Sequence, residues 1–419
     1  MSAVMKHDYN FGKILNSIRG LVREGLELNQ NDCLRISMST PNFGEDEIVE
    51  AIDSLIRQNV TMGSKVAAFE KQFAEYIGSK HAIMVNSGST ANLLMMAAIT
   101  NPDYSSQVMP GDEVIVPALT WGTTLWPIIQ MGCIPVLVDS DLDTLNIDVD
   151  EVRKAITPKT KAIFAVHILG NAAKIDELSA LADEFGLILL EDTCESLGTS
   201  YKGRKVGTIG EMGSFSFFFS HHITTIEGGM VVTDNDDLAE LLKALRAHGW
   251  TRHLEDRSIE ADYPEIDPRF MFCNVGYSVR PTEIQGAFGI HQLRKLDAYN
   301  ARRREVAGLL RQTLAHLPIR FTRPTEGADH TWFGFPVLLE KGSRKDLCDY
   351  LSDHNIDTRP IIAGNLAKHP ALGKFEHRIQ GELPNAQRVM ENGFYIGSHP
   401  DMTQNQVIRI SRVMSEYFT

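Results

Sequence analysis

Residues 213–230, GSFSFFFSHHITTIEGGM, decide the fold that the sequence predicts. Their aromatic run, residues 215–219, predicts a buried strand. The run breaks at Ser220, His221 and His222, and an apolar strand pattern returns at residues 228–232. A polar turn between two apolar strands is a place where a sheet enzyme can hold reactive groups.

The same stretch resembles the segment that carries the cofactor-binding lysine in the sugar aminotransferases of the DegT/DnrJ/EryC1/StrS family. The family pattern is roughly S-F-S-F-x-x-[ST]-K-x-x-x-x-G-E-G-G, and the chain fits it at Ser214, Phe215, Ser216, Phe217, Ser220, Glu227, Gly228 and Gly229. His221 takes the place of the lysine, and no lysine occurs between Lys205 and Lys243. The resemblance implies that Ser216 and Ser220 contact pyridoxal phosphate.

The replacement of lysine by His221 changes the expected chemistry. A lysine amine condenses with the aldehyde of the cofactor, and an imidazole, which has no primary amine, cannot. An imidazole can carry a proton near neutral pH, because its unperturbed pKa is about 6.5. The resemblance therefore implies an untethered cofactor in its amine form, pyridoxamine phosphate, with His221 as a free acid and base. The alternative is an inactive aminotransferase relative in which the histidine only fills the gap.

Length and composition predict a large globular protein that does not bind nucleic acid. The 419 residues are 43% hydrophobic, enough for one large and one smaller domain. The net charge of −13 disfavours nucleic acid and anionic membranes as partners. No apolar run reaches the roughly 20 residues of a membrane span, and the start lacks a secretion signal, so we expect a cytoplasmic protein. The cysteines are far apart and predict reduced thiols rather than a metal site: Cys33, Cys133, Cys194, Cys273 and Cys348.

Strand and helix patterns alternate through the first two thirds of the chain. Strands are predicted at residues 81–86, 113–117, 134–139, 161–167 and 187–192, with helices between them. This order predicts a mostly parallel sheet with helices on both faces. The resemblance implies the α/β fold of aspartate aminotransferase, known as fold type I. We expect a helical arm at residues 1–40, a cofactor-binding domain at 41–300 and a small α+β domain at 301–419.

The strand at residues 81–86 leads through a turn of small residues into an apolar helix at 91–99. A helix N-terminus offers free N–H groups and a positive dipole end to a phosphate. Small hydroxyl residues are also ordinary helix caps, and the pattern alone favours that reading. The resemblance adds the phosphate role and implies Gly88, Ser89 and Thr90 as ligands.

Two further strands end in residues that resemble ring contacts of the family. Trp121 follows the strand at 113–117 and matches an aromatic that stacks on the pyridine ring, although a core tryptophan is an equal alternative. Asp192 ends the strand at 187–192 and matches the acid that pairs with the pyridine nitrogen. Glu195 falls near the place of the ring hydroxyl. A strand-end acid can instead cap the next helix.

Residues 274–287 resemble a family segment whose asparagine reaches the cofactor phosphate of the neighbouring subunit. Ser278 takes that place here, and the resemblance implies a homodimer with shared sites. Arg252 and Arg359 are candidates for binding a carboxylate or a phosphate, because a guanidinium suits bidentate pairing. A solvated Arg252 is a close alternative. Asn365 is a candidate substrate contact, from a T-R-x-x-x-A-G-N-like segment.

The Ser-His-His form of the motif resembles the histidine-bearing dehydratase branch of the family, which acts on GDP-linked or CDP-linked 4-keto-6-deoxyhexoses. The CDP-linked type uses an iron–sulfur cluster, and residues 251–270 contain no cysteine, so we expect the GDP-linked type without a metal. The resemblance implies removal of the C3 hydroxyl, with glutamate restoring the cofactor amine. The alternatives are a nucleotide-sugar aminotransferase and a non-catalytic binding protein of the same fold.

Overall fold

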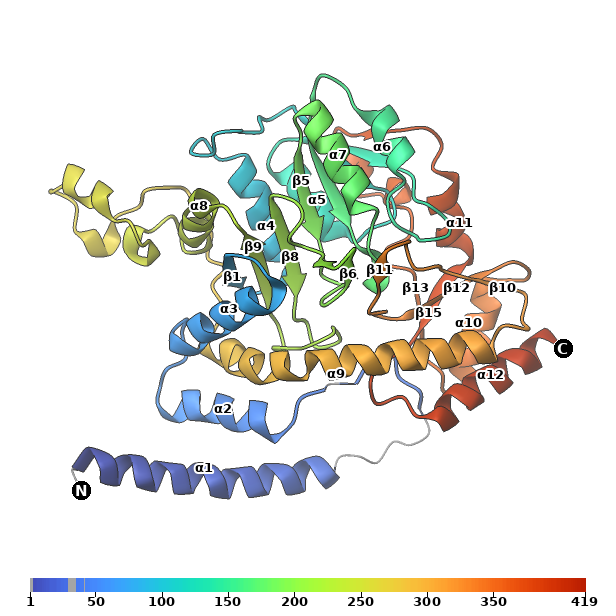
Figure 1. The fold of residues 1–419 in the computed structure, drawn as a ribbon, viewed down its shortest axis with the longest axis horizontal. Helices are drawn as coiled ribbons and strands as arrows, with labels where there is room; N and C mark the ends of the chain where they lie inside the picture. The colour runs from blue at the N-terminus through green and yellow to red at the C-terminus, as the bar shows by residue number, and fades with distance from the viewer. Residues whose placement is uncertain (1–2, 29–34, 41) are drawn as a thin grey trace.

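The computed structural model describes residues 3–28, 35–40 and 42–419. Its centre is an eight-stranded sheet in the order β1-β9-β8-β5-β4-β2-β3-β14 (Figure 1). All neighbours from β8 to β14 are parallel, and β9 is antiparallel to both β8 and β1. The strands are β1 (His81–Val85), β2 (Glu113–Pro117), β3 (Ile134–Val138), β4 (Thr160–Val166), β5 (Ile188–Asp192), β8 (Met212–Ser216), β9 (Gly229–Thr233) and β14 (Arg378–Ile379). The prediction of a mostly parallel sheet is confirmed.

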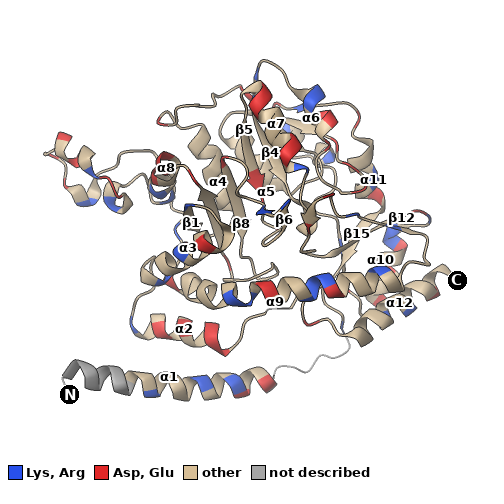
Figure 2. Cartoon of the chain, viewed as in Figure 1, with Lys and Arg blue, Asp and Glu red and all other residues tan. Residues whose placement is uncertain are grey.

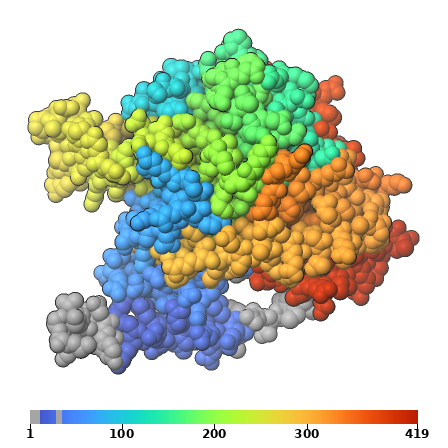
Figure 3. All heavy atoms as spheres, viewed as in Figure 1, coloured from blue at the N-terminus to red at the C-terminus, as the bar shows by residue number. Residues whose placement is uncertain are grey.

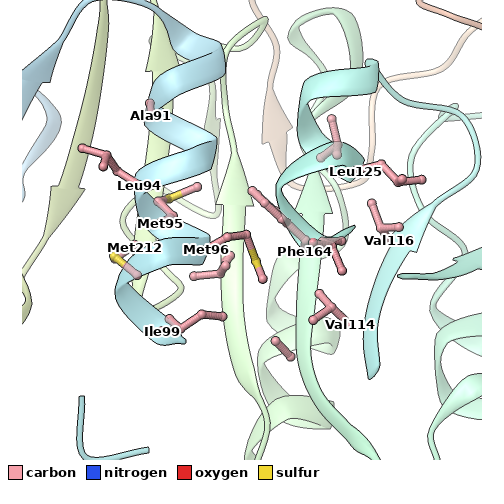
Figure 4. Packing of buried hydrophobic residues seen from close by; sticks show 14 of the residues in the cluster. Ala91, Leu94, Met95, Met96, Ile99, Val114, Val116, Leu125, Phe164 and Met212 are labelled. Carbon is pink, nitrogen blue, oxygen red and sulfur yellow. The ribbon is translucent and has the colours of Figure 1, made fainter. Parts of the chain in front are cut away.

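Helices cover both faces of this sheet because its strands are apolar on both faces. On β2, Val114 and Val116 pack into one core cluster, and Ile115 between them packs into another. The first cluster includes side chains of α4 (Gly88–Ile99), α5 (Gly122–Gln130) and α8 (Asp236–Arg246), and Figure 4 shows Leu125 of α5 near Val116, with the side chains of α4 in the same layer. The second includes α6 (Val149–Ala155) and α7 (Ile175–Phe185).

The predicted aromatic strand is wrong beyond Ser216. The last residue pair between β8 and β9 joins Ser216 to Gly229. The chain then closes on itself, because the Phe217 N–H donates to the Gly228 carbonyl (2.9 Å). Phe218 and the residue after it leave the sheet, 38% and 43% exposed, so the aromatic run supplies turn residues as well as strand residues.

A second, antiparallel sheet lies in the C-terminal third, in the order β10-β12-β15-β13. Its strands are β10 (Ile319–Phe321), β12 (Phe335–Leu339), β13 (Thr358–Pro360) and β15 (Gly393–Ile396). It packs with α10 (Arg344–Asp353), α12 (Gln404–Phe418) and the end of α9 (Glu283–Thr313). However, β14 pairs with β3 of the large sheet, and α11 (Pro384–Asn392) contributes to the large core. The domain boundaries stay a prediction.

The N-terminal arm is one helix, α1 (Ala3–Leu28), which lies along α2 (Glu45–Ile56) in Figure 1. Figure 2 shows acidic residues on α2 and basic residues on α1, where Arg23 binds Glu45 (2.8 Å) and Arg19 binds Asp46. These exposed pairs contribute little to stability individually. No helix in the described part of the chain is long and apolar enough to cross a membrane.

The remaining elements are short, except for α3 beside α9. They are α3 (Ser64–Ile77), β6 (Ser200–Tyr201), β7 (Arg204–Lys205), β11 (Ala328–Asp329) and the 3-10 helices η1 (Ile168–Gly170), η2 (Thr251–His253), η3 (Ser258–Asp262), η4 (Pro268–Phe270), η5 (Leu366–Lys368) and η6 (Leu372–Lys374). The segment with η2, η3 and η4 projects from the body as an arm, yellow in Figure 3.

Candidate active site

A cavity of about 340 Å³ lies where β4, β5 and β8 end and where α4 and α5 begin, with the second sheet on its other side. The carboxyl ends of parallel strands are the usual ligand site of open α/β sheets. The predicted site residues that line this cavity are Gly88, Ser89, Trp121, Asp192, Glu195, Ser216, Ser220, His221 and Arg359. The fold thus brings together residues that lie up to 271 positions apart in the sequence (359 minus 88).

The N-terminus of α4 forms one end of the cavity. Ser87 caps the helix by accepting a hydrogen bond from Thr90 N (3.2 Å). The Thr90 hydroxyl donates to Asn86 (2.7 Å) and does not line the cavity. The N–H groups of Gly88 and Ser89 have no partner among the described residues. A Cβ atom at Gly88 would lie 2.5 Å from Ser216 Cβ, so only glycine lets α4 begin this close to β8.

Asp192 ends β5 and is 5% exposed. Its Oδ2 accepts hydrogen bonds from Asn92 Nδ2 (2.8 Å) and Thr124 Oγ1 (2.7 Å), and its Oδ1 accepts one from Cys194 N (3.0 Å). Asn92 is fixed in turn, because its Oδ1 accepts from Ser214 Oγ (2.5 Å). Three donors around one carboxyl group suit an ionised carboxylate, which can only accept.

Behind Asp192 lies a buried pair that sequence reasoning missed. His167 Nδ1 accepts a hydrogen bond from Ala173 N (3.0 Å), so the ring proton is on Nε2, which faces Glu191 Oε2 at 3.0 Å. Burial alone would raise the pKa of Glu191, but hydrogen bonds from His167 and from three backbone N–H groups outweigh burial and lower it. His167 also lines the cavity, with its ring orientation fixed by these two hydrogen bonds.

Glu195 faces the same cavity and accepts a hydrogen bond from Leu169 N (3.1 Å). Burial raises the pKa of Glu195 to about 8, the nearby Asp192 charge adds to this effect, and the Leu169 hydrogen bond opposes it. Around neutral pH this carboxyl group therefore keeps its proton in most molecules and can donate a hydrogen bond.

His221 and His222 are placed differently. His221 lines the cavity, with its ring 5.0 Å from the Phe333 ring and 5.9 Å from the Phe218 ring. Its buried Nδ1 has no hydrogen-bond partner among the described residues. Burial, and then the charge of Arg303, lowers the pKa of His221 to about 3. His222 is fully buried and outside the cavity lining, so of these two adjacent histidines only His221 meets the cavity.

The second sheet supplies the opposite side of the cavity. Arg359 on β13 and Tyr395 on β15 are direct neighbours in the antiparallel register, and both line the cavity. Arg359 makes no ion pair or hydrogen bond within the described ranges, so its guanidinium is available to an anion. Burial raises the pKa of Tyr395, which keeps its hydroxyl group protonated.

The structure does not bring every predicted residue to the cavity of its own chain. Asn365 is 1% exposed, and its Oδ1 accepts from Ala367 N (3.0 Å) at the start of η5. Arg252 is exposed in η2, in the projecting segment. Ser278 is also exposed, and its Oγ accepts a hydrogen bond from Arg280 Nη2 (3.5 Å). With Thr90, these residues stay predictions that no cavity contact supports.

Sequence reasoning also missed several residues that line the cavity. Asn92 gave a usable signal, since it is a polar residue in an otherwise apolar helix. The others gave none, because each is an ordinary residue until the chain folds: Thr124, His167, Phe333 and Tyr395.

The described cysteines are free thiols: Cys133, Cys194, Cys273 and Cys348. Cys33 lies outside the described residues. Burial raises the pKa of Cys194, which lines the cavity. Among the residues that the structure describes, no group of three or more His, Cys, Asp or Glu side chains could hold a metal ion.

Comparison with known proteins agrees with this geometry. The model of the DegT/DnrJ/EryC1/StrS aminotransferase family matches residues 41–415. The GDP-4-keto-6-deoxy-D-mannose 3-dehydratase of Yersinia pseudotuberculosis is 40% identical over 394 residues, which cover 91% of this chain and 99% of that protein.

Two solved structures of GDP-4-keto-6-deoxymannose-3-dehydratase are also similar to this chain. One is a mutant with bound GDP-perosamine, with a TM-score of 0.85, 36% identity, and coverage of 90% of this chain and 100% of that one. The other holds a trapped PLP-glutamate geminal diamine, with a TM-score of 0.84, 36% identity and the same coverage. The matches extend over nearly the whole fold, including both sheets. This chain therefore belongs to the DegT/DnrJ/EryC1/StrS aminotransferase family.

Proposed function

We propose that this protein removes the C3 hydroxyl group of a GDP-linked 4-keto-6-deoxyhexose, with pyridoxamine phosphate as cofactor and glutamate as amino donor. The overall change balances: the sugar loses one oxygen and gains two electrons, and glutamate loses two electrons and leaves as its 2-oxo acid and ammonia. The observation that carries the proposal is His221, a neutral imidazole on the cavity wall in the place of the family's lysine.

The residues around the cavity fit the cofactor. The N–H groups of Gly88 and Ser89 would bind its phosphate at the positive end of α4. Asp192, whose carboxylate oxygens are oriented by three donors, would pair with a protonated ring nitrogen. Trp121 is 58% exposed and lines the cavity, so its indole is free to stack on a flat ring. Glu195 would donate to the ring oxygen. When bound, the cofactor supplies an amine and an electron sink.

The absence of a lysine among the described cavity residues favours a dehydratase over an ordinary aminotransferase. His221 cannot form a covalent link to the cofactor, but it can accept a proton from the reacting carbon and return one to the departing hydroxyl group. General acid and base catalysis of this kind contributes about 10²–10⁴-fold. Burial and the charge of Arg303 lower the pKa of His221, so the ring is neutral before the reaction and its lone pair is free to accept a proton.

Arg359 is the better candidate for the glutamate carboxylate, because it lines the cavity and has no partner in the described part of the chain. Ser216 and Ser220 would contact the cofactor from the turn after β8. We also propose a homodimer in which the exposed Ser278 and Arg252 approach the cavity of the second subunit. Their position outside the cavity of their own chain is compatible with that arrangement.

The test is product analysis by mass spectrometry. The purified protein is supplied with pyridoxal phosphate, glutamate and GDP-4-keto-6-deoxymannose, and with the CDP-linked and dTDP-linked sugars in parallel. The expected product lacks one oxygen atom and appears with free ammonia. An aminated sugar would instead identify an aminotransferase. No turnover together with no cofactor uptake would identify a non-catalytic relative.

A further inference from the structure

Arg303 of α9 is a buried charge that the proposed reaction leaves unexplained. It is 1% exposed. Its Nη1 donates to the Phe333 carbonyl (3.0 Å), its Nε has no partner, and no carboxylate among the described residues forms an ion pair with it. Burial lowers the pKa of Arg303 to about 10, so the side chain stays charged at neutral pH. A buried charge without a counter-ion is costly.

The contact with Phe333 leads from Arg303 to the cavity. The Phe333 peptide is held on both sides, because its N–H donates to the Leu169 carbonyl (2.9 Å) and its carbonyl accepts from Arg303. The Phe333 ring lines the cavity, with its centroid 5.0 Å from the His221 ring and 5.9 Å from the His222 ring. The ring is therefore fixed against both histidines.

The segment that carries Phe333 is also tightly packed. Trp332 has a φ of +27°, and a Cβ atom at Gly170 would lie 2.5 Å from Trp332 N. The Trp332 carbonyl accepts from Ser398 Oγ (3.1 Å). Because the backbone that leads into Phe333 is closely packed, we expect a change at Arg303 to act on the ring and on the nearby charge rather than on a flexible loop.

We propose that Arg303 is a positioning residue for His221: it fixes the Phe333 ring against the imidazole and places an unpaired positive charge behind that ring. The inference deepens the proposed function and rests on the proton-carrying role of His221. The charge disfavours a second positive charge on His221 or on His222. A proton taken up by His221 is therefore held weakly and passes readily to the leaving hydroxyl group.

Other ionisable groups also face His221, and none of them pairs with it. Those that share the cavity are His167, Asp192, Cys194, Glu195, Glu227, Arg359 and Tyr395. Asp192 is satisfied by its three donors, and Glu195 is largely protonated near neutral pH. His222 and Arg303 lie outside the cavity lining. Burial is the main cause of the lowered pKa of His221 and of His222, and the charge of Arg303 is the second cause. Asp401 is the acid that acts on Arg303, from beyond ion-pair distance.

The test compares Arg303→Met, which removes the charge, with Arg303→Lys, which keeps it. Arg304→Met is the matched control, since it removes a charge from the next position of the same helix, where Arg304 is only half-buried. Histidine ring signals are followed by NMR as a function of pH without substrate, and the His221 signal is identified by its loss in His221→Asn. The acid limb of kcat/KM is the second readout.

We expect His221 in Arg303→Met to gain its proton about one pH unit or more above the wild-type position, a tenfold change in its protonation equilibrium. The acid limb of kcat/KM should move the same way. Arg303→Lys and Arg304→Met should leave both unchanged. If His221 gains its proton no earlier in Arg303→Met than in the wild type, or equally early in Arg303→Lys, the proposal fails.

The NMR readout keeps this result separate from the proposed function, because it needs neither substrate nor turnover. A wild-type protein without dehydratase activity would contradict the proposed function and leave the effect of Arg303 on His221 measurable. If Arg303→Met does not fold, Arg303→Gln removes the charge with a polar side chain and decides between the same two outcomes.

Discussion

On one side of the cavity Asp192 accepts three hydrogen bonds, whereas on the other side the buried His221 Nδ1 has no partner among the described residues. We call the first side the aspartate wall (Asn92, Thr124, Asp192 and Cys194) and the second the histidine wall (His221, His222, Arg303 and Phe333). The aspartate wall uses hydrogen bonds to keep a charge in place. The histidine wall uses burial first, and then a nearby positive charge, to keep an imidazole neutral. A fixed charge and a mobile proton thus require opposite surroundings.

The largest expected effect comes from removing the proton carrier. His221→Asn should lower turnover by about 10²–10⁴-fold, because an amide cannot act as a base near neutral pH. Cofactor binding should persist, since the contacts of Gly88, Ser89 and Asp192 are untouched. The measurement is the rate of 3-deoxy sugar formation, with cofactor absorbance of the purified variant as the control. His222→Asn should have a much smaller effect on turnover, and equal effects of both changes would contradict the distinction between the two histidines.

The aspartate wall can be disrupted by Asp192→Asn. The new amide group would lose the charge and place a donor against Asn92 or Thr124, so we expect turnover to fall by about 10²–10³-fold. Cofactor retention after gel filtration should fall as well. In the double variant Asn92→Asp/Asp192→Asn the local hydrogen bonds can form again with the charge in the wrong place. Restored turnover in this double variant would show that hydrogen bonding, rather than the position of the charge, matters.

A smaller change, Thr124→Val, removes one of the three donors to Asp192. A hydrogen bond to a charged group contributes about 1.5–3 kcal/mol, so turnover should fall by about one to two orders of magnitude. Thr124→Ser keeps the hydroxyl group and should retain most of the activity. The comparison is made on initial rates at saturating glutamate. Equal rates for the valine and serine variants would remove Thr124 from the aspartate wall.

Buried neutral histidines also predict that the stability of the fold depends on pH. The expected effect of each histidine is the smallest of the predicted effects. Burial lowers the pKa of His330 and His399 to about 4, while both titrate near 6.5 in the unfolded chain. The unfolded state therefore binds more protons between these values, and stability is lost as pH falls from about 6.5 toward 4. Each such imidazole should cost about 1 kcal/mol between pH 7 and pH 5.5.

Urea unfolding at pH 7 and pH 5.5 measures this loss. In His330→Gln, the loss of unfolding free energy between pH 7 and pH 5.5 should be smaller by the contribution of one imidazole, about 1 kcal/mol. Carboxylates with lowered pKa values, such as Glu50 at about 2, lose their contribution only below about pH 4.5 and do not interfere. Because the raised pKa of Glu195 acts in the opposite direction, the decisive comparison is between variants: the same pH dependence of stability in His330→Gln and in the wild type would contradict the buried neutral state of this ring.

Much of the fold could be predicted from local patterns. Each of the strands β1 to β5 lies within one residue of its predicted position, because apolar runs bounded by small or polar residues mark buried strands. The aromatic run was misplaced beyond Ser216, since its end depends on where β9 stops pairing. The hydroxyl group of Thr90 bonds to Asn86, and the side chain of Asn365 caps η5. These local hydrogen bonds compete with ligand binding, and matching a sequence motif does not reveal them.

The sequence by itself determined the positions of the apolar strands along the chain, the glycine at the start of α4 and the replacement of a lysine by His221, because each depends on residue type at a short spacing. Only the tertiary structure decided which of two adjacent histidines meets the cavity, and which distant groups set its charge. Arg303 is 82 positions from His221 (303 minus 221), and Phe333 lies between them in space although not in sequence. Electrostatic and packing effects depend on distance through the folded molecule, so no local pattern could contain them.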